Sequence, residues 1–594
     1  MSLLAPQSAP THARPARRPP ESPRRPNPAW AIAAATVLAA LFAARVLVVI
    51  GHDSITSDES THLGHSLHFW ATGDDLGIWA LGTARLPHIL AGGASYLALD
   101  LAGLMPEAGE GLAGRIRALV LSGEPRVLIP ARLTGLLWGL GLLAVVAWGV
   151  GRRRGLAAGL VAAALLSMVP EVLAHSAIAG SDLPFAASAM LFAALLARYA
   201  EGPTRGRWIA VAMAAGLAWS VRHTAVLLVA SAVVARGIVA IRGARADGRW
   251  ARALAECSAS CAGMAAIAAA LLWAGDGLAT VTPAALAARS EHVAIPQRIG
   301  PIDISKVPIP TSLISVAMQV RHQGQGHQAY FLGERREHGW PLYFPVAFAL
   351  KTPIGLLGLL AIAAARSRPR SWGAWEWTCA GLLGLLGFSL IRGHVNIGVR
   401  YALLAYPLAM PFQARLFEPA ALRDRLWGPL AIALAVLFAG ESLSAHPRYL
   451  SWFNATGGGP SRGWLYLADS NIDWGQDLDG LADACGRLGI AEVTTDISSD
   501  RTLSAPGLAV HRFASLEGQV LDDPSTPPGR RLPGASGSYL SVPTRYMAVS
   551  TSRLMGLYGQ NDLNWLRTRR LAARVGDSIF LFDLDGPAER PLGL

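Results

Sequence analysis

Long apolar runs alternate with short polar turns along most of the chain, and many of them approach the roughly 20 residues that a helix needs to cross a bilayer. Arginine clusters follow every second run, as at 151–154 and 366–370. Because positive residues gather on the cytoplasmic side of membranes, this alternation predicts a polytopic α-helical membrane protein. We expect about eleven transmembrane helices: 30–50, about 127–151, a third reaching His175, a fourth ending at Arg198, 208–221, 224–239, about 253–274, 343–366, a ninth reaching about Ile391, 401–415 and 427–444.

The same pattern divides the chain into three parts. Residues 1–28 are rich in Pro and Arg and are predicted to be a disordered basic cytoplasmic tail. Residues 29–445 form the predicted transmembrane domain, with long exterior loops at 51–125 and 276–340. A cleaved signal peptide is the alternative for 30–50, but the length of this run and the many that follow favour an uncleaved anchor.

Beyond residue 445 the chain becomes polar. Short apolar stretches such as 577–582 are typical of strands, and 478–488 is typical of a helix. Residues 446–594 therefore predict a small α/β domain, and an odd number of spans places it outside. We expect a multi-pass protein of the cell inner (plasma) membrane, with a cytoplasmic N-terminus and a periplasmic or extracellular C-terminal domain.

Composition and charge agree with the pattern. The 594 residues are 52% hydrophobic and only 15% charged, which is too apolar for an ordinary soluble protein. The formal net charge of +12 is almost all arginine, since lysine occurs only at Lys306 and Lys351. Because this charge falls between apolar runs, it indicates topology, and we expect no nucleic-acid partner.

Asp58 and Glu59 stand together just after the first span, where the chain would first meet water. Adjacent carboxylates repel each other and are costly to desolvate at a membrane boundary, so their presence favours an acid–base function. A solvated polar loop is the alternative. We take Asp58 and Glu59 as candidate catalytic residues.

Further ionisable residues occur in turns that the topology places on the same exterior side. Such residues at the ends of spans are costly and are therefore functional candidates. Acids gathered with Arg and His predict a site that activates a hydroxyl and holds an anionic, phosphorylated group. The candidates are His175 and Asp182 after the third span, Arg222 after the fifth, and His394, Arg400 and Tyr401 in the ninth-to-tenth turn.

Several of these residues also have structural interpretations. Arg222 could snorkel to the membrane surface, and Arg400 could pair with lipid headgroups. Lys351 lies inside an apolar run, where a cation needs an anion or a structural partner. His62, His65 and His68 recur every three residues, which suits a plain polar helix face better than a metal site.

The ordered set of motifs resembles the GT-C superfamily of membrane glycosyltransferases that use polyprenyl-phosphate sugars. It is most similar to the family containing protein O-mannosyltransferases and the aminoarabinose transferase of lipid A. The chain departs from it at Arg222, where relatives often carry Lys, and at 85–88, where many carry a Lys/His-Pro-Pro motif. The resemblance rests on Asp58-Glu59, 175–182, 216–222, 339–353, 396–401 and 469–477.

The resemblance implies an inverting displacement on a polyprenyl-phosphate-linked sugar donor at the outer face of the membrane. Asp58 would be the base for an acceptor hydroxyl, and Glu59 would orient the acceptor or tune the pKa of Asp58. His175, Asp182 and Tyr401 would line the donor pocket, with the lipid tail between spans. The donor phosphate would be held by residues drawn from Arg85, Arg222, Lys351, His394 and Arg400.

The identity of the sugar and of the acceptor, whether protein, lipid or glycan, stays open. A divalent metal is compatible with such a site, although the residues do not require one, and we assign no metal ligand. A polytopic transporter of an anion or lipid is the first alternative function. Because no internal repeat is found and the charges lie in exterior turns, an enzyme is favoured. The second alternative is a non-catalytic lipid-binding protein of the same fold.

Overall fold

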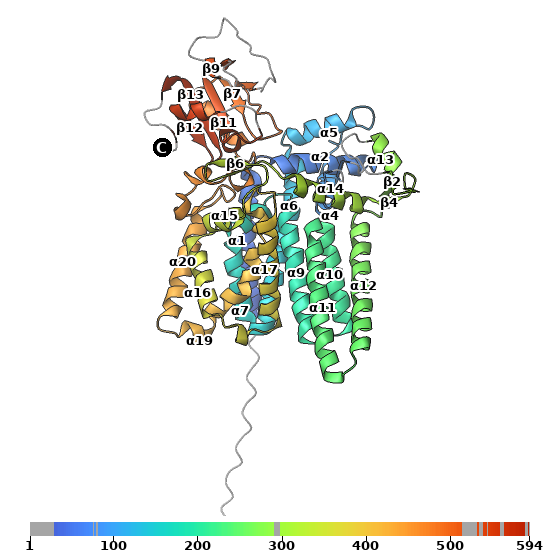
Figure 1. Ribbon diagram of the computed structural model, residues 1–594. Helices are drawn as coiled ribbons and strands as arrows, with labels where there is room; N and C mark the ends of the chain where they lie inside the picture. Colours follow the sequence, from blue (N-terminus) through green and yellow to red (C-terminus); the bar gives the residue numbers. More distant parts are fainter. Residues whose placement is uncertain are drawn as a thin grey trace, which may run out of the picture.

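A bundle of long helices carries a small β-sheet at one end in the computed structural model of the chain (Figure 1). The structure describes residues 29–74, 77–78, 81–289, 297–513, 531–533, 539–542, 544–558, 563–587 and 592. The tail predicted at 1–28 lies outside these residues.

Among the described residues, seven helices are long and apolar enough to cross a membrane. The chain is therefore a multi-pass membrane protein. The seven are α1 (Ala29–His52), α6 (Pro125–Arg154), α9 (Asp182–Glu201), α11 (Val226–Asp247) with the preceding turn η1 (His223–Ala225), α12 (Trp250–Gly275), α17 (Ala374–Arg392) and α20 (Trp427–Ser444).

Two predicted spans are broken rather than continuous. Helices α7 (Leu156–Ser167) and α8 (Pro170–Ser176) meet at 75°, and α15 (Tyr343–Lys351) and α16 (Ile354–Arg366) meet at 117°. Proline follows each break, and it forces the residue before it out of the helical conformation, as the extended ψ of 131° at Thr352 illustrates. Counting each bent pair as one span raises the total to nine.

The fifth and tenth predicted spans are short helices. Helix α10 (Arg205–Val221) has 17 residues, and α18 (Ala405–Gln413) has 9 and is preceded by the turn η3 (Val399–Ala402). Both lie in the bundle, but neither is among the seven helices that are long and apolar enough to cross a membrane by themselves. The total of eleven spans therefore stays a prediction. Short helical pieces complete this part: η2 (Pro369–Ser371), η4 (Ala414–Phe417) and α19 (Pro419–Leu422).

Small residues let the helices of the bundle pack closely. A Cβ atom on Gly159 of α7 would come within 2.3 Å of the Ala147 carbonyl oxygen of α6, and one on Gly355 of α16 would come within 2.4 Å of the Leu434 carbonyl of α20. Glycine at these two positions brings the helix axes together. The buried core runs through this packed region, from Phe42 of α1 to Phe438 of α20.

The long segments predicted as exterior loops fold into short helices and hairpins that cover one end of the bundle (Figure 1). The first segment holds α2 (Ser57–Thr72), α4 (Leu86–Leu101) and α5 (Leu112–Leu121). The second holds α13 (Pro283–Arg289), α14 (Thr311–Gln325) and strands β1 (Thr280–Val281), β2 (Arg298–Ile299), β3 (Ile302–Asp303) and β4 (Ile309–Pro310). Strands β5 (Ala329–Phe331) and β6 (Glu334–Arg336) pair near the end of the same segment.

The C-terminal part contains a five-stranded mixed sheet with strand order β12-β13-β11-β7-β8. Strand β7 pairs parallel to β8 and β11, whereas β13 pairs antiparallel to β11 and β12. Helix α21 (Leu478–Arg487) packs on the sheet through an apolar cluster that includes Leu481 and Leu581. The strands are β7 (Glu492–Asp496), β8 (Ala509–Arg512), β11 (Tyr546–Ser550), β12 (Arg569–Val575) and β13 (Ile579–Pro587); a separate pair is β9 (Arg531–Pro533) and β10 (Tyr539–Ser541).

The chain between α20 and α21 joins the sheet to the bundle. It consists of irregular segments and the turns η5 (Ala455–Gly457), η6 (Gly463–Leu465) and η7 (Asp469–Asn471); helix α22 (Thr551–Leu554) and the turn η9 (Asn564–Thr568) lie near the sheet. Residues Trp464 and Phe580 share one apolar cluster with Tyr343 of α15. The strand expected at 577–582 and the helix expected at 478–488 are therefore present, while the boundaries and exterior location of a separate domain stay predictions.

Candidate active site

A polar cavity of about 380 Å³ lies where the covering helices meet the end of the bundle. We call it the polar chamber. Its walls come from α2, the turn between α8 and α9, the turn between α10 and α11, helix α14 and η3. The lining includes Asp58, His62, His88, Asp182, Arg222, His223, Gln319, His322, His327, Arg400, Tyr401 and Trp474.

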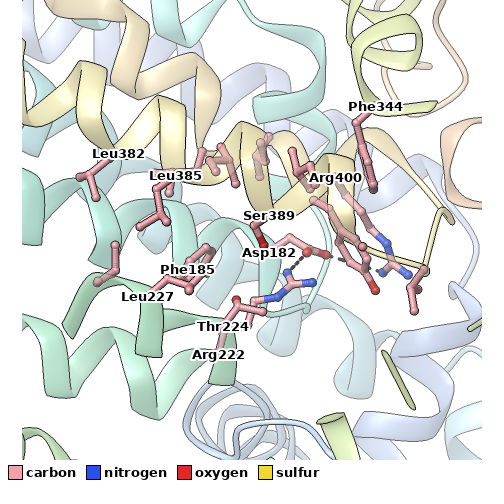
Figure 2. A pocket seen from close by; sticks show the side chains of 18 of the residues that line it. Asp182, Phe185, Arg222, Thr224, Leu227, Phe344, Leu382, Leu385, Ser389 and Arg400 are labelled. Atoms are coloured by element: carbon pink, nitrogen blue, oxygen red, sulfur yellow. Dashed lines mark hydrogen bonds and ion pairs between the residues drawn. The ribbon is translucent and has the colours of Figure 1, made fainter. Parts of the chain in front are cut away.

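A second cavity, mainly apolar and about 210 Å³ in volume, opens from the same place into the bundle. We call it the apolar groove. Its walls are α9, α11 and α17, which contribute Phe185, Leu227, Leu228, Leu382, Leu385 and Leu386. Figure 2 shows leucine side chains at one end of the groove and Asp182, Arg222 and Arg400 at the other.

Six residues line both cavities: Asp182, Arg222, Thr224, Gln319, Arg400 and Tyr401. Arg222 is ion-paired with Asp182, and Arg400 lies 3.6 Å from the same carboxylate. The Arg222 guanidinium stands 4.7 Å from the centre of the Tyr401 ring. Two cations are thus fixed at the junction of a polar and an apolar space.

Asp58 belongs to this cluster through Arg400. Its Oδ2 atom accepts a hydrogen bond from Arg400 Nη1 at 2.7 Å, although 342 residues separate the two in sequence. The Asp58 side chain stays 43% exposed, so it faces the chamber. The face of Arg400 is covered by Trp474, whose ring centre lies 4.2 Å from the guanidinium carbon.

The local sequence positions Asp58 in the first turn of α2. Thr56 caps this helix, and Glu59 completes a capping box by accepting the Thr56 backbone N–H at 3.0 Å. Since the N-terminal turn of a helix carries partial positive charge, it stabilises an ionised Asp58.

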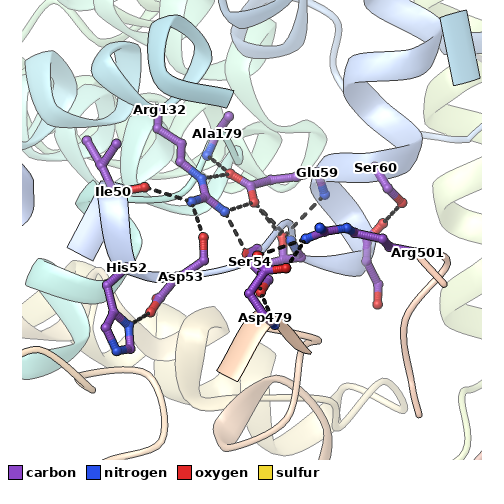
Figure 3. Close-up of polar contacts among 12 residues, drawn as sticks. Ile50, His52, Asp53, Ser54, Glu59, Ser60, Arg132, Ala179, Asp479 and Arg501 are labelled. Carbon is purple, nitrogen blue, oxygen red and sulfur yellow. Dashed lines mark hydrogen bonds and ion pairs between the residues drawn. The ribbon is translucent and has the colours of Figure 1, made fainter. Parts of the chain in front are cut away.

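Glu59 is fully buried and makes a different set of contacts from its neighbour. Both of its oxygens accept hydrogen bonds from Arg132 of α6, at 2.9 and 2.8 Å, and Oε1 also accepts the Ala179 N–H at 2.9 Å (Figure 3). Arg132 donates further to the carbonyls of Ile50, Asp53 and Ser54. This network ties α1, α2, α6 and the turn before α9 together.

Electrostatics keep Asp58 ionised. Loss of surrounding water would raise the pKa of Asp58, but the charge and hydrogen bond of the Arg400 guanidinium outweigh that effect and hold the pKa below its usual value. Burial lowers the pKa of His62, and it lowers the pKa of His88 well below the ordinary histidine value. The chamber thus combines a charged carboxylate with neutral imidazoles at neutral pH.

Four of the sequence-predicted residues lie away from the junction. Lys351 is fully buried; its ammonium lies 3.0 Å from Glu171 of α8 and donates to the carbonyls of Leu450 and Asn471. His175, also buried, lies beside the same Glu171 at 3.5 Å. Neither residue lines the polar chamber or the apolar groove.

Arg85 and His394 are placed elsewhere as well. Arg85 is buried at the start of α4, where it donates to the Asp276 carbonyl and covers the Phe69 ring at 4.2 Å. His394 is exposed and contacts only the ring of His338 among the ring contacts of the described residues. The structure therefore gathers Asp58, Glu59, Asp182, Arg222, Arg400 and Tyr401 around the chamber, and separates the other four candidates from them.

Sequence reasoning placed His62 on a plain polar helix face and gave His88 no role in the site, yet both line the chamber. His62 lies one turn after Asp58 on α2, and its ring stacks on His88 at 3.8 Å. Both ring nitrogens of the buried His88 lack a hydrogen-bond partner among the described residues, which is costly unless water or a ligand binds them. The four-residue spacing of Asp58 and His62, which places both on one face of a helix, could be seen in the sequence. The stacking of His62 on His88 could not.

Arg132 is a further residue that was not predicted from the sequence. It lies inside an apolar span, and an intramembrane arginine is itself a sign of function or of a specific partner. No metal site can be assigned: the part of the chain that the structure describes contains no group of three His, Cys, Asp or Glu side chains able to hold an ion.

Comparison with known proteins supports the resemblance. Residues 118–273 match the model of the family described as dolichyl-phosphate-mannose-protein mannosyltransferase. The resemblance to this glycosyltransferase family is confirmed over that segment. The segment contains Arg132, Asp182 and Arg222, and it ends before Arg400. No curated protein matches the chain.

Two solved structures of ArnT from Cupriavidus metallidurans are similar to the chain. The structure bound to undecaprenyl phosphate has 16% sequence identity and a TM-score of 0.44, and the match covers 78% of this chain and 73% of that one. The apo structure has 13% identity and a TM-score of 0.29, with 92% and 98% covered.

Proposed function

We propose that the chain is an inverting glycosyltransferase that moves a monosaccharide from a polyprenyl-phosphate donor to a hydroxyl acceptor. The observation that carries this proposal is the junction itself, where an apolar groove between spans meets a polar chamber beside Arg222, Arg400 and Asp58. The match of residues 118–273 to a family of polyprenyl-type sugar transferases supports the same reaction class.

The two cavities suit the two ends of a polyprenyl-phosphate sugar. The groove, with its leucine walls, would receive the first isoprene units of the tail, because burying apolar chain there removes it from water. Arg222 and Arg400 lie at the inner end of the groove, where the phosphate would follow. A guanidinium presents a planar fork of donors, which suits bidentate binding of phosphate oxygens.

In the reaction, the Asp58 carboxylate would accept the proton of the acceptor hydroxyl as that oxygen attacks the anomeric carbon. The bond from the anomeric carbon to the phosphate oxygen breaks at the same time, and the electron pair leaves with the polyprenyl phosphate. Arg222 and Arg400 would stabilise the negative charge that develops on this oxygen. Attack from the face opposite the leaving group inverts the anomeric configuration.

The remaining charged residues would act on the site indirectly. Asp182 holds Arg222 and lies 3.6 Å from Arg400, so it would keep both guanidinium groups aimed at the junction. Glu59, fully bonded to Arg132, would position the first turn of α2 and hence Asp58. Lys351 is engaged by Glu171 and would support the bundle rather than bind phosphate.

The arrangement in the membrane is part of the proposal. The arginine clusters at 151–154 and 366–370 lie at the ends of α6 and α16, and positive residues favour the cytoplasmic side. The chamber would then open at the outer face of the inner membrane, with residues 446–594 outside.

The test uses the purified full chain in detergent with a polyprenyl-phosphate sugar and extracts of envelope glycans and glycoproteins as acceptor. We expect release of free polyprenyl phosphate, and we expect Asp58→Asn to slow it by about 10²- to 10⁴-fold, the usual contribution of a general base. Asp100→Asn, at an exposed position of α4 outside the chamber, is the matched control. Full activity in a well-folded Asp58→Asn variant would refute the assigned base.

The same assay separates the enzyme from a transporter. A transporter would move labelled donor between the leaflets of vesicles without cleaving the bond between sugar and phosphate. Intact donor after prolonged incubation with every acceptor fraction, together with translocation, would therefore favour transport.

A further inference from the structure

A third cavity, about 730 Å³ in volume, lies between α9, α10, α11 and α12 and is lined by four arginines. We call it the arginine cavity. Its arginines are Arg205, Arg236, Arg249 and Arg252, and the single carboxylate among its lining residues is Glu256. This excess of positive charge sets it apart from the polar chamber, where Asp58 and Asp182 pair with the two arginines.

The arginine cavity lies at the opposite end of the helices from the polar chamber. Helix α9 begins at Asp182 in the chamber and reaches Tyr199 in the arginine cavity, about 17 residues and on the order of 25 Å along the axis. Figure 1 shows α9, α10, α11 and α12 side by side, with their lower ends away from the β-sheet. A ligand here would contact neither Asp58 nor the apolar groove.

Three of the arginines are explained by membrane topology. Arg205 begins α10, while Arg249 and Arg252 lie at the start of α12, where basic residues orient a span. Arg252 is ion-paired with Glu256 at 2.9 Å. These three arginines alone would indicate only an ordinary basic turn between two spans.

Arg236 is not explained in this way. It lies inside the span 223–245, nine residues before Arg245 and so roughly 14 Å from that end of the helix. Its side chain is half-buried in the cavity wall, and it makes no hydrogen bond or ion pair with the described residues of the chain. A cation inside a span is costly unless an anion lies beside it. The position of Arg236 therefore indicates that an anion binds in this cavity.

The walls of the arginine cavity suit a lipid better than a small solute. Small and apolar residues of the spans line the cavity together with Arg236, including Val239, Ala240, Gly243, Ala244, Ala253 and Ala259. Tyr199 and Trp208 close one side, with their rings 4.9 Å apart. An amphiphile could place acyl carbons against these walls and a phosphate between the guanidinium groups.

We propose that the arginine cavity binds the phosphate headgroup of an anionic phospholipid, with Arg236 as its deepest contact. Arg205 and Arg249 add charge at the rim, in the region where basic pockets between spans attract anionic lipids. The site is separate from the proposed catalytic junction, and its occupancy would stabilise α9–α12 against one another.

The test measures the thermal unfolding midpoint of the full chain in detergent as lipid is added. The probes are dioleoylphosphatidylglycerol, dioleoylphosphatidylcholine with the same tails but no net charge, and inorganic phosphate. We expect saturable stabilisation by phosphatidylglycerol alone, because a ligand that binds only the folded state raises the midpoint. Equal stabilisation by phosphatidylcholine, or by inorganic phosphate, would overturn the assignment of an anionic lipid.

Two variants locate the site. Arg236→Gln should weaken the apparent affinity for phosphatidylglycerol by about tenfold, whereas Arg152→Gln, an exposed arginine at the end of α6 with the same loss of charge, should not. If Arg236→Gln does not fold, the double variant Arg205→Gln/Arg249→Gln at the rim replaces it. Unchanged affinity in the variant that folds would overturn the proposal.

Discussion

Replacing Arg132 with methionine should destabilise the protein strongly, because it leaves Glu59 as an unpaired charge in a fully buried place. Both side chains of the pair are at most 1% exposed. Arg132 also donates to three carbonyl oxygens, at Ile50, Asp53 and Ser54. Breaking a buried pair by removing one partner costs about 3–5 kcal/mol. We expect a loss in that range, accompanied by loss of activity as the first turn of α2 moves.

The assay follows unfolding in mixed detergent micelles by tryptophan fluorescence, for Arg132→Met, Glu59→Gln and the double variant. The double variant should lose less than the sum of the two single losses, because no unpaired charge remains. Arg126→Met is the control: its side chain is 57% exposed in a surface pair on the same helix, so its loss should stay within about 1 kcal/mol. Strictly additive losses, or a loss for Arg132→Met no larger than the control, would refute this reasoning.

Two further predictions concern the ion pairs at and near the junction. Arg400→Gln removes a charge that lowers the pKa of Asp58, so that pKa should rise. A carboxylate base is inactivated by protonation as the pH falls through its pKa, so the acidic limb of the kcat/KM profile should move to higher pH. An unmoved limb would contradict the assignment of Asp58 or its coupling to Arg400. Lys351→Met should lower stability by about 3–5 kcal/mol through the unpaired Glu171. Activity per folded molecule, measured on the monodisperse fraction, should stay near wild type, whereas a specific fall in kcat/KM for the donor would show that Lys351 binds phosphate.

Much of the membrane architecture could be predicted from the sequence, because the length and apolarity of a span are local properties. The arginine clusters fixed the expected side of each turn, and Asp58, Asp182, Arg222 and Arg400 were expected at one face. The breaks at Pro170 and Pro353 were also visible in the sequence as prolines, but the bend angles depend on neighbouring helices.

The partner of each charge could not be predicted. Lys351 and Glu171 are 180 positions apart, and Glu59 and Arg132 are 73 apart. Topology puts such residues at similar depth, but it does not give the rotation of each helix about its axis. A half-turn of α15 about its own axis would point the Lys351 side chain away from Glu171 of α8.

The sequence by itself therefore determined a multi-pass membrane protein with acids and arginines at the ends of its spans. Only the tertiary structure decided that Asp58 faces a chamber while the adjacent Glu59 is buried, because consecutive side chains on a helix point about 100° apart. Packing also separated Arg222 and Arg400, which line the cavities, from Lys351, which is enclosed. These choices depend on contacts between distant segments, and such contacts form only when the helices pack.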